Sequence, residues 1–176
     1  MEIDNTFLDL DSLNRLVIPS TNVHLLVAGR TGSGKTRATL FLVAKAFLQN
    51  PNVDFWFADF KNGGDYHFAM DSGHLLGIDD LIDGALMELK SRQAGLPDRY
   101  PYLIVLDEYP SFILSLEPKA RKEYQSKLAT LLNLGRSFEI HVWVITQRPG
   151  AELFANGSRD NFNCRILMGT PSPETR

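Results

Sequence analysis

The segment VAGRTGSGKT, residues 27–36, is the strongest indication of fold in this chain. Its last eight residues have the spacing Gly-x-x-x-x-Gly-Lys-Thr, which is typical of a loop whose backbone N–H groups surround a phosphate. An apolar run, VHLLVA at 23–28, precedes the loop, and a helical pattern, TRATLFLVAKAFL at 36–48, follows it. A glycine-rich turn that binds no nucleotide is the alternative. Because the loop joins a strand pattern to a helix pattern, we favour the phosphate-binding loop.

On both sides of this loop, strand-like and helix-like segments alternate along the chain. Apolar runs of strand length occupy 23–28, 54–60, 102–108, 141–147 and 165–169. Helical patterns occupy 35–49, 79–93 and 119–136. The apolar runs do not alternate with polar residues, as expected of strands buried on both faces. The sequence therefore predicts an α/β fold, a mostly parallel sheet sandwiched by helices, with its ligand site at the carboxyl ends of the strands.

The length indicates one domain. The chain has 176 residues, of which 44% are hydrophobic, enough for a single buried core. Residues 1–22 carry only a weak pattern, and we interpret them as an N-terminal lead-in segment before a core domain at 23–176. Further elements often follow the fifth strand of such sheets, so a core truncated at its C-terminus is an open expectation.

Charge and composition exclude several classes of protein. The net charge of −3 and the pI near 5.8 argue against a broad basic surface that holds duplex DNA by charge alone, although a pore or a local patch can still be basic. The single cysteine, Cys164, rules out an internal disulfide. The acidic N-terminus does not have the form of a signal peptide, and no apolar stretch has the ~20 residues of a membrane helix. We expect a cytoplasmic protein with no membrane segment.

The phosphate-binding loop predicts the residues that bind ATP. Lys35 is expected to reach the β and γ phosphates, and Thr36 to offer its hydroxyl to Mg²⁺. The full set expected to bind ATP is Gly29, Arg30, Thr31, Gly32, Ser33, Gly34, Lys35 and Thr36.

Two acids follow another buried run. In YLIVLDEYP, residues 102–110, apolar residues lead to Asp107 and Glu108 at the predicted end of a strand. We expect Asp107 to hold the metal through a water, and Glu108 to orient and polarise an attacking water. The alternative, two solvated acids at the end of a buried strand, loses weight because the phosphate loop is present. The pair favours hydrolysis over phosphate transfer to an acceptor.

Two further strand ends carry polar residues. VWVITQRP, residues 142–149, places Gln147 where an amide can contact the γ phosphate or the lytic water; a strand end turned by Pro149 is the alternative. FADFKNGGDY, residues 57–66, carries Asp59 and Lys61, two residues apart and hence on one face of a strand. A salt-bridged surface pair is the competing interpretation of Asp59 and Lys61.

Taken together, four segments resemble the FtsK/SpoIIIE family of DNA-pumping ATPases, within the wider FtsK/HerA group. They are HLLVAGRTGSGKT, FADFKNGGDY, LIVLDEYPSFI and LLNLGRSFEIHVWVITQRPGAELFANGSRDNFNCRI. The resemblance covers residues 23–166, and this compact version is similar to the coupling ATPases of Gram-positive conjugative elements. Relatives carry a membrane anchor before the core and a winged-helix module after it, neither of which is in this sequence.

The resemblance implies a RecA-like P-loop core that assembles as a ring, usually a hexamer, and threads double-stranded DNA through its centre. It implies that Lys35 and Thr36 bind ATP and Mg²⁺, that Asp107 and Glu108 are the metal-binding and catalytic acids, and that Gln147 senses the γ phosphate. Arg30 departs from the small polar residue that many relatives have there.

The same resemblance implies residues at subunit boundaries. Arg165, in N-F-x-x-R-I, looks like the arginine that completes the catalytic site of the neighbouring subunit, and Arg136 is the second choice for that role. Asp59 and Lys61 are implied to lie near the subunit boundary.

The sequence is consistent with three functions. The first is an ATP-driven double-stranded DNA translocase, with ATP hydrolysed at subunit interfaces and with membrane-complex or conjugation partners. The second is a nucleotide-dependent assembly scaffold that moves no DNA. The third, a small-molecule kinase, ranks lowest because Glu108 follows Asp107 and no Arg-rich lid is evident.

Overall fold

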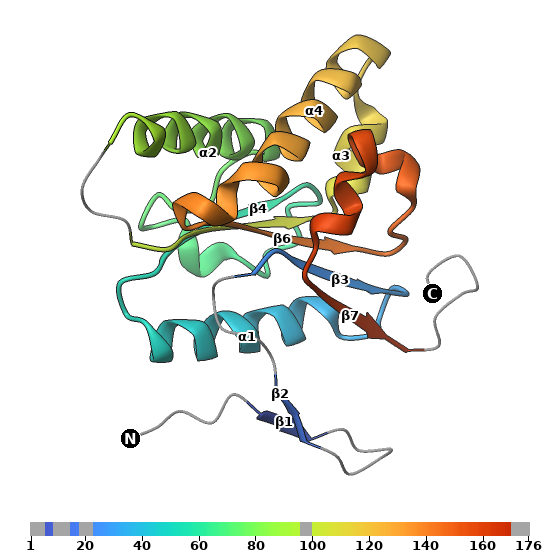
Figure 1. Cartoon of the computed structure of the whole chain (residues 1–176). Helices are drawn as coiled ribbons and strands as arrows, with labels where there is room; N and C mark the ends of the chain where they lie inside the picture. The colour runs from blue at the N-terminus through green and yellow to red at the C-terminus, as the bar shows by residue number, and fades with distance from the viewer. Residues whose placement is uncertain (1–5, 9–14, 18–22, 96–99, 170–176) are drawn as a thin grey trace.

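The computed structural model describes residues 6–8, 15–17, 23–95 and 100–169. Its main feature is a five-stranded sheet in the order β4-β5-β6-β3-β7 with every adjacent pair parallel, which confirms the predicted α/β fold (Figure 1). The strands are β3 (Leu25–Gly29), β4 (Asp54–Asp59), β5 (Tyr102–Asp107), β6 (Ile140–Thr146) and β7 (Cys164–Met168).

Helices cover both faces of this sheet. Figure 1 shows α1 (Lys35–Gln49) below the sheet, and α2 (Ile78–Gln93), α3 (Tyr109–Ser115) and α4 (Pro118–Leu134) above it. Short 3-10 turns complete the chain: η1 (His67–Ala69), η2 (Gly135–Phe138), η3 (Ala151–Leu153) and η4 (Ala155–Asn161).

The predicted helices and strands agree with these bounds to within two residues at nearly every end, and α3 is the helix that the sequence analysis missed. Its sequence, YPSFILS, is short and rich in aromatic and β-branched residues. Such residues favour strands, so the sequence does not distinguish this helix from the strand that it follows.

Part of the predicted lead-in segment is ordered as a pair of strands. β1 (Thr6–Leu8) and β2 (Arg15–Val17) pair antiparallel in a small sheet of their own. The rest of the lead-in, and residues 170–176 of the predicted core, lie outside the described residues.

The sheet is buried on both faces, which explains the unbroken apolar runs. Along β5, Leu103 and Val105 face the apolar cluster between the sheet and α1. Ile104 and Leu106 face the apolar cluster between the sheet and helices α2 and α4. All four side chains are fully buried. Successive side chains of a strand point to opposite faces, so both sets must be apolar.

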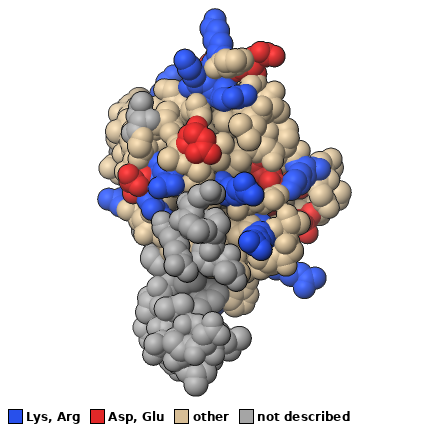
Figure 2. All heavy atoms as spheres, turned by 90° about the vertical axis from the view of Figure 1, so that its right-hand side faces the viewer, with Lys and Arg blue, Asp and Glu red and all other residues tan. Residues whose placement is uncertain are grey.

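The strand register brings the functional strand ends to one edge. Asp107 pairs with Asp59 on one side and with Ile145 on the other, and Ala28 pairs with Thr146. The carboxyl ends of the strands lie on the right in Figure 1, and Figure 2 looks onto this edge. Among the described helices, none is both long enough and apolar enough to cross a bilayer.

Replacing Ile104 by alanine should lower the free energy of unfolding by about 2–5 kcal/mol. The Ile104 side chain is buried on the sheet face that α2 and α4 cover, and its loss leaves a cavity there. Met87 on α2 is 70% exposed, so Met87→Ala is the matched control and should change the free energy by less than about 0.5 kcal/mol. Urea denaturation measures both. Equal effects would contradict the assignment of this face to the core.

Candidate active site

The predicted phosphate loop joins β3 to α1 in a turn that demands glycine. Gly34 caps α1 with φ 83° and ψ 16°, a left-handed conformation that strains other residues. At Gly29 a Cβ atom would lie 2.5 Å from the carbonyl oxygen of Met168, so β7 leaves no room for a side chain. The sequence GRTGSGKT therefore folds as a tight loop that opens directly into a helix, and its backbone N–H groups can face an anion.

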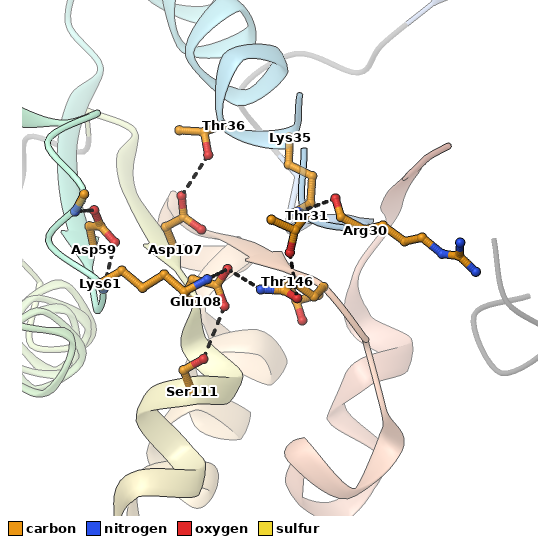
Figure 3. Close-up of polar contacts among 12 residues, drawn as sticks. Arg30, Thr31, Lys35, Thr36, Asp59, Lys61, Asp107, Glu108, Ser111 and Thr146 are labelled. Atoms are coloured by element: carbon orange, nitrogen blue, oxygen red, sulfur yellow. Dashed lines mark hydrogen bonds and ion pairs between the residues drawn. The ribbon is translucent and has the colours of Figure 1, made fainter. Parts of the chain in front are cut away.

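Lys35 and Thr36, the first residues of α1, point into the site. Lys35 is buried, and its Nζ donates to the carbonyl oxygen of Arg30 at 3.0 Å. The Thr36 hydroxyl donates to Oδ2 of Asp107 at 3.2 Å. The buried hydroxyl of Ser33 has no hydrogen-bond partner among the described residues. The side chain of Arg30 extends away from these groups (Figure 3).

The two predicted acids diverge although they are neighbours in sequence. Asp107 ends β5, and Glu108 adopts a left-handed backbone conformation, φ 59° and ψ 34°, at the start of α3. This turn sends the Asp107 carboxylate toward α1 and the Glu108 carboxylate toward the loop after β4 (Figure 3). A left-handed backbone is uncommon for glutamate and is concentrated at functional sites.

Asp107 lies in a buried environment. The Tyr66 hydroxyl donates to its Oδ2 at 3.0 Å, the same oxygen that accepts from Thr36. Burial raises the pKa of Asp107 to about 6, and these two hydrogen bonds offset only part of that rise. The nearby Asp59 and Glu108 carboxylates raise it further. Asp107 is therefore costly to ionise until a cation compensates it.

Glu108 lies in the opposite electrostatic environment. Burial acts to raise its pKa, but hydrogen bonds from Lys61, Gln147 and Ser111, with the Lys61 charge, lower the pKa overall. Lys61 Nζ lies 2.7 Å and Gln147 Nε2 lies 3.1 Å from its Oε1, and the Ser111 hydroxyl lies 3.2 Å from its Oε2. The carboxylate is thus ionised and held by three donors.

Gln147 connects the phosphate loop with this carboxylate. The Thr31 hydroxyl donates to Gln147 Oε1 at 3.1 Å, while Gln147 Nε2 donates to Glu108. The amide thus lies between the loop and the acid, directly after β6, at the strand end where the sequence placed it. Its contact with the γ phosphate or the lytic water stays a prediction.

Asp59 and Lys61 do not form the surface salt bridge considered from the sequence. Asp59 accepts the backbone N–H groups of Lys61 at 3.0 Å and of Gly63 at 2.7 Å, so it shapes the turn after β4. The Lys61 ammonium pairs with Glu108 instead. Both residues line the same cleft as the phosphate loop.

The two candidate trans arginines lie outside this cleft. Arg165, on edge strand β7, pairs in register with Leu26 and donates to the Arg159 carbonyl oxygen at 3.0 Å and to Asp160 at 3.2 Å. Arg136 lies in η2, before β6 begins, at the end of the sheet opposite the phosphate loop. Service to a neighbouring subunit stays a prediction for both.

The cleft has a volume of about 480 Å³ and is lined by the phosphate loop, the start of α1, the turn after β4, the two acids and Gln147. Among the described residues, no cluster of three or more His, Cys, Asp or Glu side chains could hold a metal alone. Mg²⁺ commonly takes few protein ligands and completes its shell with phosphates and water. Thr36 and Asp107 beside a phosphate loop fit a nucleotide-bound Mg²⁺.

Comparison with known proteins identifies this arrangement. No protein-family model matches the chain. The FtsK domain-containing protein YdcQ of Bacillus subtilis (strain 168) is 30% identical over 170 residues, which cover 85% of this chain and 35% of YdcQ. The chain belongs to the FtsK/SpoIIIE-type P-loop ATPases.

One further sequence relative and one solved structure of similar fold are both longer than this chain. The type VII secretion system protein EssC of Staphylococcus aureus (strain NCTC 8325 / PS 47) is 29% identical over 157 residues, which cover 72% of this chain and 10% of EssC. The structure of the pCW3 conjugation coupling protein TcpA with ATPγS superposes with a TM-score of 0.63 at 20% identity, covering 88% of this chain and 50% of TcpA. The chain thus spans about a third of YdcQ and a smaller part of EssC.

Sequence reasoning missed two residues of this ATPase site. Tyr66, in the GGDY segment, is buried against Asp107, and Ser111, in the unpredicted α3, contacts Glu108. The paired glycines before Tyr66 signal a turn that returns the chain to the sheet, and this is the one signal that could have pointed to Tyr66.

Asp107→Asn should stabilise the ligand-free chain at pH 8, because it removes an ionised carboxylate whose charge burial disfavours. The folded-state pKa of Asp107 is raised to about 6 from 3.8, so its stabilising proton is fully bound below 3.8 and is lost as the pH rises through 6. The advantage of Asp107→Asn should therefore shrink by about 1 kcal/mol between pH 8 and pH 5. Urea denaturation at the two pH values measures it, and an equal difference at both would contradict the raised pKa.

Proposed function

We propose that this chain is the core of an ATP-driven motor that moves double-stranded DNA. The proposal rests on one observation: the phosphate loop lines the same cleft as two acids, one with a raised pKa and one with a lowered pKa. Thr36 contacts Asp107, and Gln147 links Thr31 to Glu108, so the loop and both acids form one hydrogen-bonded unit. ATP and Mg²⁺ are its proposed cofactors.

The proposed division of labour follows from each residue's surroundings. Lys35 and the loop N–H groups bind the phosphates, and Thr36 and Asp107 hold Mg²⁺, which supplies charge stabilisation to the transferred phosphate when bound. Glu108 is ionised and is linked to the loop through Gln147, and it orients and polarises the attacking water. Gln147 bonds both Thr31 and Glu108, so it is placed to couple the presence of the γ phosphate to the position of Glu108.

DNA is the proposed substrate for two reasons. The sequence relative YdcQ carries an FtsK domain, and TcpA is named as a conjugation coupling protein. Figure 2 shows Lys and Arg side chains, with Asp and Glu among them, over the face at the carboxyl ends of the strands, so cations that can contact DNA phosphates are present although the whole chain is acidic. We further propose that this chain is cytoplasmic, assembles as a hexameric ring and acts with partners in a conjugation or membrane complex.

Transport of a polypeptide is the second candidate. EssC, which matches 72% of this chain, belongs to a type VII secretion system. A nucleotide-dependent scaffold that moves nothing, the second function considered from the sequence, is the other candidate. All three need the same ATP site, and they differ in what stimulates turnover.

Glu108→Gln should retain ATP binding and lose about 10²–10⁴-fold in hydrolysis, because the amide cannot accept the proton of the attacking water. Lys35→Ala should weaken binding itself, since it removes the cation of the phosphate loop. Nucleotide binding by calorimetry and phosphate release separate the two variants. Hydrolysis at the wild-type rate by Glu108→Gln would remove Glu108 from the mechanism.

Hydrolysis should rise steeply with protein concentration and rise further with long double-stranded DNA at low salt, because ring assembly completes each site. Arg165→Ala should bind nucleotide as a monomer and lose this concentration-dependent rise, whereas Lys90→Met on α2 is the control. Phosphate release measured across a concentration series gives both results. A rate that is flat and indifferent to DNA would favour the scaffold over the translocase.

A further inference from the structure

We propose that a polar pocket at the amino ends of the strands binds a small tetrahedral oxyanion such as inorganic phosphate. The pocket has a volume of about 160 Å³ and lies where α4 ends and β3 begins, at the end of the sheet opposite the phosphate loop. Its polar lining residues are His24, Asn133, Arg136, Ser137, Asn161 and Asn163. The inference does not depend on the proposed function, because none of these residues lines the cleft of the ATP site.

His24 gives this pocket a buried donor. The residue is 1% exposed, and its Nδ1 accepts the backbone N–H of Val142 at 3.0 Å. Burial, together with the His141 ring and the Arg136 charge, lowers the pKa of His24 to about 3, so the ring is neutral and carries its proton on Nε2. This Nε2–H has no hydrogen-bond partner among the described residues. A buried N–H without an acceptor is costly, and an anion in the pocket would satisfy it.

The Nε2 side of the ring faces the end of α4, which lines the pocket. The backbone of Leu132, near the end of α4, acts to raise the pKa of His24, the effect expected of a carbonyl oxygen close to Nε2. The two groups do not meet the geometry of a hydrogen bond, since Nε2 has no partner in the described part of the chain. The Nε2–H is therefore a donor on the wall of the pocket.

The charges around the pocket favour an anion. Arg136 is exposed in η2, directly after α4, and none of the described residues forms an ion pair with it. Of the described residues that line the pocket, none is acidic. The side chains of Ser137 and Asn163 have no hydrogen bond to any described residue, while Asn161 donates to Asn133 at 2.5 Å. The lining thus offers one cation and several donors, with no carboxylate to compete for them.

The fold brings these groups together at the amino ends of three adjacent strands, β6, β3 and β7. His24 directly precedes β3, and its carbonyl oxygen accepts the N–H of Cys164, the first residue of β7, at 3.2 Å. Asn163 therefore lies beside His24. A Cβ atom on Gly135 would lie 2.7 Å from a backbone oxygen at the start of β6, so only glycine lets η2 lie this close to the sheet. This contact places Arg136, the next residue, at the same end of the sheet.

A phosphate-sized anion fits this pocket better than a single water. The volume is several times the space that one water needs. The oxygens of a tetrahedral oxyanion can accept from a guanidinium, an imidazole N–H and side-chain amides at once. The carboxyl end of α4 opposes an anion through its dipole, but this effect is weaker than direct hydrogen bonds to a charged ligand.

The pocket gives Arg136 a ligand within its own chain. The resemblance found in the sequence implied a different use, in which Arg136 contacts nucleotide held by the phosphate loop of a neighbouring subunit. Lys35→Ala separates the two uses, because it impairs the phosphate loop and leaves every residue of the pocket in place.

The test titrates the full chain with inorganic phosphate, without nucleotide, and follows the His24 Nε2–H resonance by ¹H–¹⁵N NMR. The resonance is assigned by its absence in His24→Gln, and sodium chloride at equal ionic strength is the control for salt. The resonance should shift saturably in the wild type, in Lys35→Ala and in the exposed control Lys90→Met. Arg136→Met, which removes the charge, should weaken phosphate binding at this site by at least about tenfold.

Three NMR results would overturn the proposal. They are a resonance that phosphate moves no more than chloride does, an unchanged affinity in Arg136→Met, and a response that disappears in Lys35→Ala. A crystal structure grown in phosphate gives an independent check. A phosphate oxygen within hydrogen-bond distance of both His24 Nε2 and the Arg136 guanidinium supports the proposal, and water alone in the pocket overturns it. Neither readout requires ATP hydrolysis, so failure of the proposed function would leave this test intact.

Discussion

The pairing of β5 between β4 and β6 is the constraint on which the site depends. It sets Asp107 opposite Asp59 on one strand and Ile145 on the other. Glu108 follows Asp107 by one residue, Lys61 follows Asp59 by two, and Gln147 follows Ile145 by two. The Lys61 and Gln147 side chains therefore meet at the Glu108 carboxylate. A slip of one residue in either pairing would turn every side chain of the strand to the other face. The buried apolar residues on both faces of β5 therefore fix the strand register, and the register aligns the residues of the site.

The two neighbouring acids at the end of β5 have pKa values shifted in opposite directions. Asp107 is buried, and its pKa is raised to about 6, whereas the donors around Glu108 lower the pKa of that side chain. A pair of acids whose environments drive their pKa values apart is suited to a division of roles. Burial makes the ionised form of Asp107 costly unless a cation compensates its charge, which suits a metal ligand. Glu108 is ionised without one, which suits an acid that must act on water.

Much of this arrangement could be predicted from local sequence. The GRTGSGKT loop, the apolar runs and the paired Asp107 and Glu108 each carry a local pattern, and the structure places them as expected at the carboxyl edge of the sheet. What could not be predicted depends on turns. The partner of Lys61 depends on how Asp59 ties the loop, and the contact of Tyr66 with Asp107 spans 41 residues of sequence. α3 was missed because YPSFILS has the composition of a strand, and Ser111 was missed with it.

The most direct test of the central claim is a crystal structure of the chain with Mg²⁺ and ATPγS. The account predicts the phosphates in the loop at residues 29–36, the metal between the Thr36 hydroxyl and the Asp107 carboxylate, and Glu108 facing the γ-thiophosphate with a water between them. The Thr36 hydroxyl would then turn from Asp107 to the metal. A nucleotide bound elsewhere, or a Glu108 carboxylate turned away from the γ-thiophosphate with no water between them, would contradict the account.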